Sequence, residues 1–286
     1  MSNPLIEPQD LQELLGTTSV VPIDTRSPEA YAAGHLPGAI NMPEIFTFLA
    51  TSTPEGLAEL EQQFSEKFGA IGLDGKKTAV LYEDAMDTGF GQSCRGLFLL
   101  EHLGYPKDKI RILHGGFQGW VAADLPVSTQ APTPVATPFP LNSGASDVML
   151  DKDDVLAALD RDDVVLLDVR DVDEWIAESS SPYGKDFCPR KGRLPEAVWI
   201  EWYRFMKPGE VARFKSPSEI RAECDSVGIT PDSEVFLYCF KGARASNTLV
   251  ALRAAGIENV RLYFGSWNEW SRDPNLPIEE GLPFVA

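Results

Sequence analysis

The sequence predicts an α/β fold made of two similar halves, each an open, mostly parallel sheet flanked by helices. Short apolar runs typical of buried strands alternate along the chain with segments of helical periodicity. Blocks of the first half also recur in the second half in the same order. Strands that alternate with helices favour a parallel sheet, and ligands bind at the carboxyl ends of the strands of such sheets.

The elements of the first half follow from local patterns. Leucines on one face predict a helix over residues 8–15, and Ser27 followed by Pro28 is a typical helix start, with Gly34 as its end. We expect further helices over residues 64–71 and 91–103, and strands over residues 20–24, 39–41, 78–82 and 110–113.

The second half repeats these patterns, which indicates a tandem duplication. The matched blocks are residues 20–24 with 164–169, 24–26 with 168–170, 34–39 with 192–197, 81–82 with 237–238, and 115–120 with 265–270. Residues 128–146 are rich in Pro, Ser and Thr and lack periodicity, so they predict a semi-extended linker. The predicted organisation is therefore an N-terminal domain over 1–127, a linker over 128–146 and a C-terminal domain over 147–286.

Composition narrows the class of function. The 286 residues carry a net charge of -18, which argues against binding to nucleic acid or to an anionic membrane surface. No apolar run is long enough for a membrane span, and the first residues lack the pattern of a secretory signal, so we expect a cytoplasmic location. The four cysteines lack the paired spacing of a disulfide framework or a zinc site, and we expect no metal.

One cysteine stands where a reactive group is expected. Cys239 closes the apolar run 235–238, and a short loop with Gly242 leads from it into a helix predicted from about Ser246. Loop N–H groups, the helix N-terminus and the charges of Lys241 and Arg244 all favour thiolate over thiol, and the thiolate is the nucleophile.

The loop and the repeated blocks resemble the rhodanese-like sulfurtransferases. The loop of that family is a cysteine followed by five residues with a central glycine and cationic positions, here residues 239–244. The stretch from Asp24 to Ala39 resembles the first signature of the family. The resemblance covers nearly the whole chain and implies the two-domain arrangement, in which the C-terminal domain is catalytic and the N-terminal domain is silent. Glu83 stands at the position of the first half that matches Cys239.

The resemblance implies sulfur transfer by Cys239 and no cofactor. Cys239 would take the outer sulfur of a small anionic donor as a persulfide and pass it to cyanide or to a thiol, with a thioredoxin-like protein among the acceptors considered. Lys241 and Arg244 would hold the donor, and the cationic loop favours thiosulfate. The remaining predicted substrate-binding residues are loop residues Phe240, Gly242, Ala243 and Ala245, and the arginines Arg190 and Arg193 near the facing turn.

Three alternatives stay open at this point. A 3-mercaptopyruvate sulfurtransferase carries small neutral residues in this loop, whereas Lys241 is cationic. A phosphatase of the same fold has five residues between its cysteine and arginine, and here four separate Cys239 from Arg244. A sulfur carrier or binding module would form the persulfide without fast turnover.

The other candidate residues have simpler interpretations. Cys94 and Cys224 fall within predicted helices and are expected to pack in the core. Cys188 lies in residues 177–191, an insertion that the first half lacks, where it could be exposed and redox-active, but we favour a cysteine without a functional role. The Asp-x-Arg pairs at 24–26 and 168–170 are expected to be ion pairs that hold the fold, because the same pair occurs in the silent half.

Overall fold

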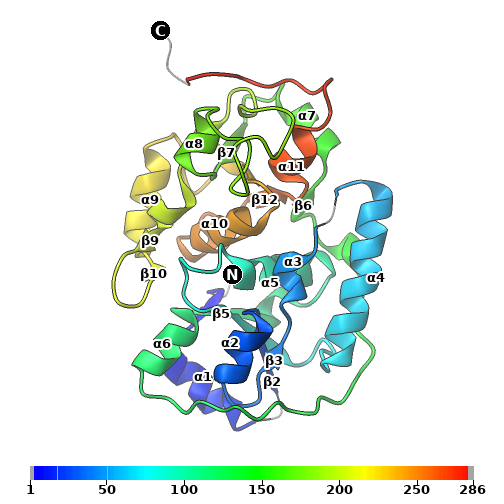
Figure 1. The fold of residues 1–286 in the computed structure, drawn as a ribbon, viewed down its shortest axis with the longest axis vertical. Coiled ribbons are helices and arrows are strands. Elements are labelled where there is room, and N and C mark those ends of the chain that lie inside the picture. The colour runs from blue at the N-terminus through cyan, green and yellow to red at the C-terminus, as the bar shows by residue number, and fades with distance from the viewer. Residues whose placement is uncertain (1–2, 18, 50, 283–286) are drawn as a thin grey trace. The chain divides into compact units, whose positions relative to one another are not determined.

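The computed structural model of the protein describes residues 3–17, 19–49 and 51–282. The chain forms two compact units (Figure 1). The first contains residues up to 48, 57–147 and 206–214, and the second contains 49–56, 148–205 and the residues from 215 onward. Each unit holds one five-stranded parallel sheet flanked by helices, so the predicted fold class is confirmed.

The sheet of the first unit has the strand order β1-β5-β4-β2-β3. Its strands are short and largely buried, as expected for a parallel sheet covered on both faces. The elements of this part of the chain are β1 (Leu5–Ile6), α1 (Pro8–Leu15), β2 (Val20–Asp24), α2 (Pro28–Ala33), β3 (Ile40–Asn41), α3 (Glu44–Thr47), α4 (Pro54–Ala70), β4 (Thr78–Tyr82), α5 (Gln92–His102), β5 (Ile110–Leu113), α6 (Gly116–Ala122), β9 (Met206–Lys207) and β10 (Arg213–Phe214).

The sheet of the second unit repeats this order as β6-β12-β11-β7-β8. Strand β11 lies at its centre, between β7 and β12, so the residue after β11 emerges at the carboxyl edge of the sheet. The elements are β6 (Met149–Leu150), α7 (Lys152–Ala158), β7 (Val164–Asp168), α8 (Val172–Trp175), β8 (Val198–Trp199), α9 (Pro217–Asp225), β11 (Glu234–Tyr238), α10 (Ala243–Ala254), β12 (Val260–Tyr263) and α11 (Ser266–Trp270).

Both sheets carry the same buried ion pair, as predicted. In the second unit, Arg170 donates from Nη2 to Asp168 at 2.6 Å and to the carbonyl of Gly192 at 2.7 Å, and the Tyr238 hydroxyl donates to the same Asp168 oxygen at 2.7 Å. The corresponding residues of the first unit are Arg26, Asp24, Gly34 and Tyr82, with distances of 2.7 Å for all three bonds. Each arginine ties the end of a strand to the turn that precedes the edge strand, β3 or β8, and pairs with a carboxylate that is buried with it.

Two predicted helices are longer than expected, and the predicted linker packs against the first unit. The helix expected over residues 64–71 belongs to the longer α4, and the helix expected from Ser246 begins at Ala243, directly after Gly242. Residues 129–142 contain no helix or strand. They pack along the first unit, where the Thr137 N–H donates to the Gly69 carbonyl at 2.9 Å. None of the helices in the described part of the chain has both the length and the apolar character that a membrane span requires.

Candidate active site

The Cys239 thiol lies at the carboxyl end of β11, buried, beside the first turn of α10. The N–H of Gly242 points at its sulfur, with 3.1 Å between the nitrogen and Sγ. Gly242 adopts φ of 85°, a left-handed conformation that glycine reaches without strain. A Cβ at this position would also lie 3.2 Å from the ring of Phe264. The glycine therefore lets the loop turn its N–H toward the sulfur, which stabilises negative charge there.

The start of α11 fixes this loop from the other side. The Ser266 hydroxyl accepts from the Cys239 N–H at 3.2 Å and donates to the Tyr263 carbonyl at 2.8 Å. The N–H groups of Trp267 and Asn268 donate to the carbonyls of Cys239 and Phe240, each at 3.0 Å. These bonds fix the backbone of Cys239 and Phe240, which leads into the Gly242 N–H that points at the sulfur. The sequence reasoning missed Ser266, although its block, 265–270, was recognised as repeated.

Arg244 is buried and paired with acidic residues of the α8 segment. Its Nη1 and Nη2 donate to the Glu174 carboxylate at 2.6 and 3.1 Å, and Nη1 lies 3.0 Å from Asp171. Burial by itself would lower the pKa of the Arg244 guanidinium. The negative charges around it, Glu174 above all, outweigh burial, so this pKa is raised. Arg244 therefore keeps its charge although it is buried, with both terminal nitrogens bound to carboxylates. That Arg244 also binds the donor directly stays a prediction.

The same acidic residues are the group among the described residues that comes nearest to a metal-ligand cluster. One oxygen each from Asp171, Asp173 and Glu174 lie within 4.8 Å of one another. Two of these residues already pair with Arg244, so the protein itself supplies the counter-charge. The contacts of Asp171 and Glu174 with Arg244 account for the acidic groups gathered here.

Phe240 and Lys241, the two residues between Cys239 and Gly242, contact side chains of the insertion at 177–191. The Phe240 ring is buried against Tyr183 and Phe187, with centroids 5.4 and 5.8 Å away. Lys241 places its ammonium 5.3 Å from the centroid of the Tyr183 ring.

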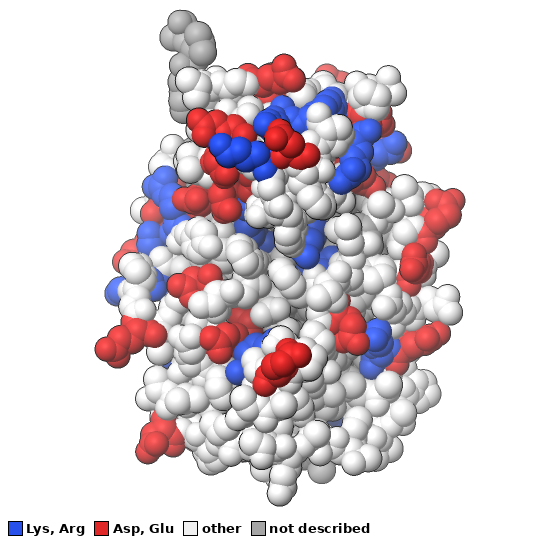
Figure 2. Space-filling model, viewed as in Figure 1, with Lys and Arg blue, Asp and Glu red and all other residues white. Residues whose placement is uncertain are grey.

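The surface of the second unit carries basic side chains although the net charge of the chain is -18. Figure 2 shows Lys and Arg side chains gathered, with acidic ones between them, over the region between α8 and α11.

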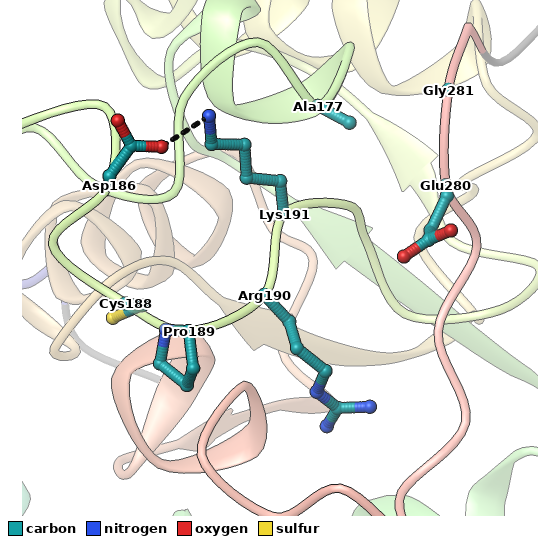
Figure 3. Close-up of a pocket in the computed structure, with 8 residues that line it drawn as sticks. All are labelled: Ala177, Asp186, Cys188, Pro189, Arg190, Lys191, Glu280 and Gly281. Carbon is teal, nitrogen blue, oxygen red and sulfur yellow. Dashed lines mark ion pairs between the residues drawn. The ribbon is translucent and has the colours of Figure 1, made fainter.

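Arg190 and Arg193, the two arginines predicted near the donor, are bound elsewhere in this structure. Arg190 donates to the backbone carbonyls of Trp270, Ser271, Asp273 and Leu276, which closes the end of α11. Arg190, Lys191 and Asp186 line a pocket of about 560 Å³. Figure 3 shows the Arg190 guanidinium turned away from Lys191, and the Lys191 ammonium pairs with Asp186 at 2.6 Å.

Arg193 occupies the second-unit position that matches His35. It pairs with Glu279 at 3.0 Å and donates to the Gly281 carbonyl at 2.8 Å. Its backbone forms a bridge with Glu279, as His35 does with Ser128. The structure therefore shows structural contacts for both arginines, and a role in donor binding stays a prediction for each.

The other cysteines are buried and lack the surroundings of Cys239. Burial, and then the neighbouring Glu83, raise the pKa of the Cys94 thiol, and burial raises that of Cys224 to about 12. Cys188, for which exposure was considered, is buried, and its sulfur lies 3.8 Å from Arg272. High thiol pKa values disfavour the thiolate, so Cys94 and Cys224 are poor candidates for the nucleophile.

Comparisons with known proteins match both halves of the chain. A family model described as the rhodanese-like domain matches residues 7–123 and 151–273. A thiosulfate sulfurtransferase of Azotobacter vinelandii is 31% identical over 275 residues, 96% of each chain, and one of Pseudomonas aeruginosa is 29% identical over the same shares. The sulfur carrier protein TtuD of Thermus thermophilus is 28% identical over 88% of this chain and 87% of that protein.

Solved structures agree with the fold. An EanB variant in complex with hercynine superimposes with a TM-score of 0.84 at 25% identity, covering 98% of this chain and 70% of that one. The anaerobic ergothioneine biosynthesis enzyme from Chlorobium limicola gives a TM-score of 0.81, also at 25% identity.

Proposed function

Since the chain belongs to the rhodanese-like family and is a rhodanese-type sulfurtransferase, we propose that it moves the outer sulfur of thiosulfate through a persulfide on Cys239. The observation that carries the proposal is the Gly242 N–H, 3.1 Å from the Cys239 sulfur at the start of α10. This N–H is a hydrogen-bond donor directed at the side chain of Cys239, which is anionic both as a thiolate and as a persulfide. Preorganised donors of this kind stabilise charge without reorganisation during the reaction.

In the first step the Cys239 thiolate attacks the outer sulfur of thiosulfate. A bond forms between Sγ and that sulfur, and the bond between the two thiosulfate sulfurs breaks, with its electron pair leaving on sulfite. The persulfide anion then lies among the N–H groups of residues 240–245. Lys241 attracts the incoming dianion, and Arg244 contributes its charge from the pair with Glu174.

In the second step a nucleophile attacks the outer sulfur of the persulfide. Cyanide leaves as thiocyanate, and a thiol leaves as a new persulfide, while the electron pair of the broken bond returns to Cys239 as the thiolate. The acceptor in the cell is proposed to be a thiol, with a thioredoxin-like protein as one candidate.

A second candidate is a sulfur carrier, which the name given to the Thermus thermophilus relative favours. A carrier uses the same persulfide but delivers its sulfur to a particular partner. It predicts stoichiometric loading of Cys239 by thiosulfate, with slow turnover when cyanide is the acceptor. The two candidates therefore differ in rate and agree on the residue.

The test is a steady-state assay with thiosulfate and 3-mercaptopyruvate side by side, using cyanide as acceptor. We expect turnover with a higher kcat/KM for thiosulfate, loss of turnover in Cys239→Ser, and turnover retained in Cys224→Ser, the matched control. A higher kcat/KM for mercaptopyruvate would overturn the donor. Retained activity in Cys239→Ser would overturn the residue.

A further inference from the structure

A pocket of about 640 Å³ lies beside α8 and the edge strand β8 of the second unit. Most of its wall is apolar: Ile176 directly follows α8, Val198 and Trp199 form β8, and Val227 lies just after α9. The residues of the Cys239 loop, 239–244, are all described by the structure, and none of them lines this pocket. A pocket of this size with a mostly apolar wall and few polar groups is typical of a site for a small molecule.

The segment around α8 makes two different sets of contacts. Asp171 and Glu174 pair with Arg244 of the Cys239 loop. Trp175 and Ile176, from the same segment, line the pocket. The pocket is therefore distinct from the site of sulfur transfer, although one short segment borders both.

Two indole rings form part of the wall. The ring centroids of Trp175 and Trp199 are 6.1 Å apart, with 10° between the ring planes. The indole N–H of Trp199 is satisfied, because it donates to the Arg170 carbonyl at 2.8 Å. Trp175 is 6% exposed, and its indole N–H has no acceptor among the described residues. A largely buried donor without a partner favours a ligand that brings an acceptor atom.

The charged groups of the wall are already paired with each other. Arg193 donates from Nε to Glu279 at 3.1 Å, and its Nη2 lies 3.0 Å from the same carboxylate. Its guanidinium also lies 4.9 Å from the centroid of the Trp175 ring. A charged ligand would enter an apolar pocket without a free counter-charge, which costs free energy. The wall therefore favours an uncharged ligand.

We propose that this pocket binds a small, uncharged, planar aromatic molecule that carries a hydrogen-bond acceptor, such as an aryl ketone. The ring of the ligand packs against the apolar wall, where aromatic contacts contribute beyond the burial of area. The acceptor atom takes the indole N–H of Trp175. This ligand site goes beyond the proposed function and does not rest on it, because binding here includes no step of sulfur transfer.

The test titrates the full chain with para-fluoroacetophenone and with para-fluoroethylbenzene, which is similar in size and lacks the carbonyl, and follows both probes by fluorine NMR. The readout is the ratio of the two Kd values, because the difference in hydrophobicity between the probes cancels when ratios are compared between variants. Trp175→Phe keeps a ring and removes the N–H, so it should reduce the preference for the ketone about fivefold, the value of one hydrogen bond. Trp199→Phe, the matched control, removes an N–H that is already bonded and should keep the wild-type ratio.

A second variant locates the bound probe and does not depend on how well Trp175→Phe folds. Val227→Trp places a larger side chain at a half-buried position of the wall, and it should raise the Kd of the ketone at least about tenfold because overpacking excludes the probe. The same change at Val121, an exposed residue of α6, should leave the Kd unchanged. Thermal unfolding confirms that each variant is folded. No saturable binding of the ketone by the wild type, an unchanged ratio in Trp175→Phe, or an unchanged Kd in Val227→Trp would overturn the site.

Discussion

The loop after β4 and the loop after β11 are the same structural element with different contents. Each begins with a residue at the carboxyl end of a central strand and ends at a left-handed glycine that precedes a helix, Gly91 with φ of 78° or Gly242 with φ of 85°. Two residues separate Cys239 from Gly242, whereas residues 84–90 separate Glu83 from Gly91. In both units the helix after the following strand, α6 or α11, donates to the carbonyl of the residue after the central strand, from the Phe117 N–H to Glu83 at 2.8 Å and from the Trp267 N–H to Cys239 at 3.0 Å.

The first unit fills its loop with a side chain of its own. The Glu83 carboxyl is buried and accepts from the Ser93 N–H, in the first turn of α5, at 2.8 Å. Burial is the largest influence on it and raises its pKa to about 8, with the Ser93 bond opposing. In each unit an N–H from the start of the following helix is directed at the side chain of the residue after the strand, a carboxyl in the first unit and a thiol in the second. The comparison teaches that the duplicated fold keeps this arrangement, and that the residue after the strand decides which group the N–H meets.

The largest expected effect comes from exchanging that residue. In the double variant Glu83→Cys, Cys239→Ser, we expect thiosulfate:cyanide activity at least about a thousandfold below wild type, because a sulfur nucleophile alone restores only one part of the site. The loop 84–90 carries Asp84 and Asp87, whose charge disfavours a thiolate. Steady-state turnover is the measurement, with Cys239→Ser alone as the control. Activity near wild type would show that loop length and charge matter little.

The second effect is on stability and concerns Glu83 itself. Its folded pKa of about 8 exceeds the unfolded value of 4.5, so its contribution is full below pH 4.5 and is lost as pH rises through 8. Relative to Glu83→Gln, the wild type should lose roughly 1.4 kcal/mol of unfolding free energy per pH unit in this window, a few kcal/mol in all. Urea unfolding between pH 5 and 8.5 measures it. Glu59→Gln, at an exposed position, should follow the wild type. Parallel curves for Glu83→Gln and wild type would rule out a buried neutral carboxyl.

The third effect concerns the cation that the second loop has and the first lacks. Lys241→Ala should lower kcat/KM for thiosulfate about ten- to a hundredfold, since a charge-assisted contact is worth roughly 1.5–3 kcal/mol. The loss should be smaller for 3-mercaptopyruvate, a monoanion. Steady-state kinetics with both donors test this, with Lys76→Ala, which changes an exposed lysine of the first unit, as control. Equal losses for the two donors would contradict it.

The smallest expected effect is on stability and concerns His114, a histidine of the first unit. His114 is partly buried. Its Nε2 accepts from the Phe214 N–H at 3.0 Å, so its Nδ1 carries the proton and donates to the Glu7 carboxylate at 2.7 Å. Burial, only partly opposed by Glu7, lowers its pKa below 6.5. Its contribution is therefore full above pH 6.5 and is lost as pH falls below that value.

We expect the wild type to lose unfolding free energy between pH 7.5 and 5.5, and His114→Gln should abolish this loss. Thermal unfolding of both proteins over this range measures it. The Glu7 pKa is lowered too, so that carboxylate stays ionised in the window. If His114→Gln loses as much stability on acidification as the wild type, another group is responsible.

Local patterns were sufficient to predict most of the architecture. The helix start at Ser27 and Pro28 is as expected, with the Ser27 hydroxyl accepting from the Ala30 N–H at 3.3 Å. The expected strands β2, β4 and β5 have the predicted bounds. The start of α10 was placed three residues late, because the conformation of Gly242, which lets Ala243 begin the helix, is a property of the folded loop.

The sequence by itself determined the duplicated α/β fold, the buried Asp-Arg pairs and the position of Cys239, because these depend on residue order and on strand ends. Only the tertiary structure decided what the arginines contact. Arg244 pairs with Glu174, 70 residues away in sequence, and Arg190 binds the carbonyls at the end of α11. A cationic residue near a reactive cysteine in sequence has several partners within reach. Which carboxylate or carbonyl it binds depends on burial and distance, and these exist only once the chain has folded.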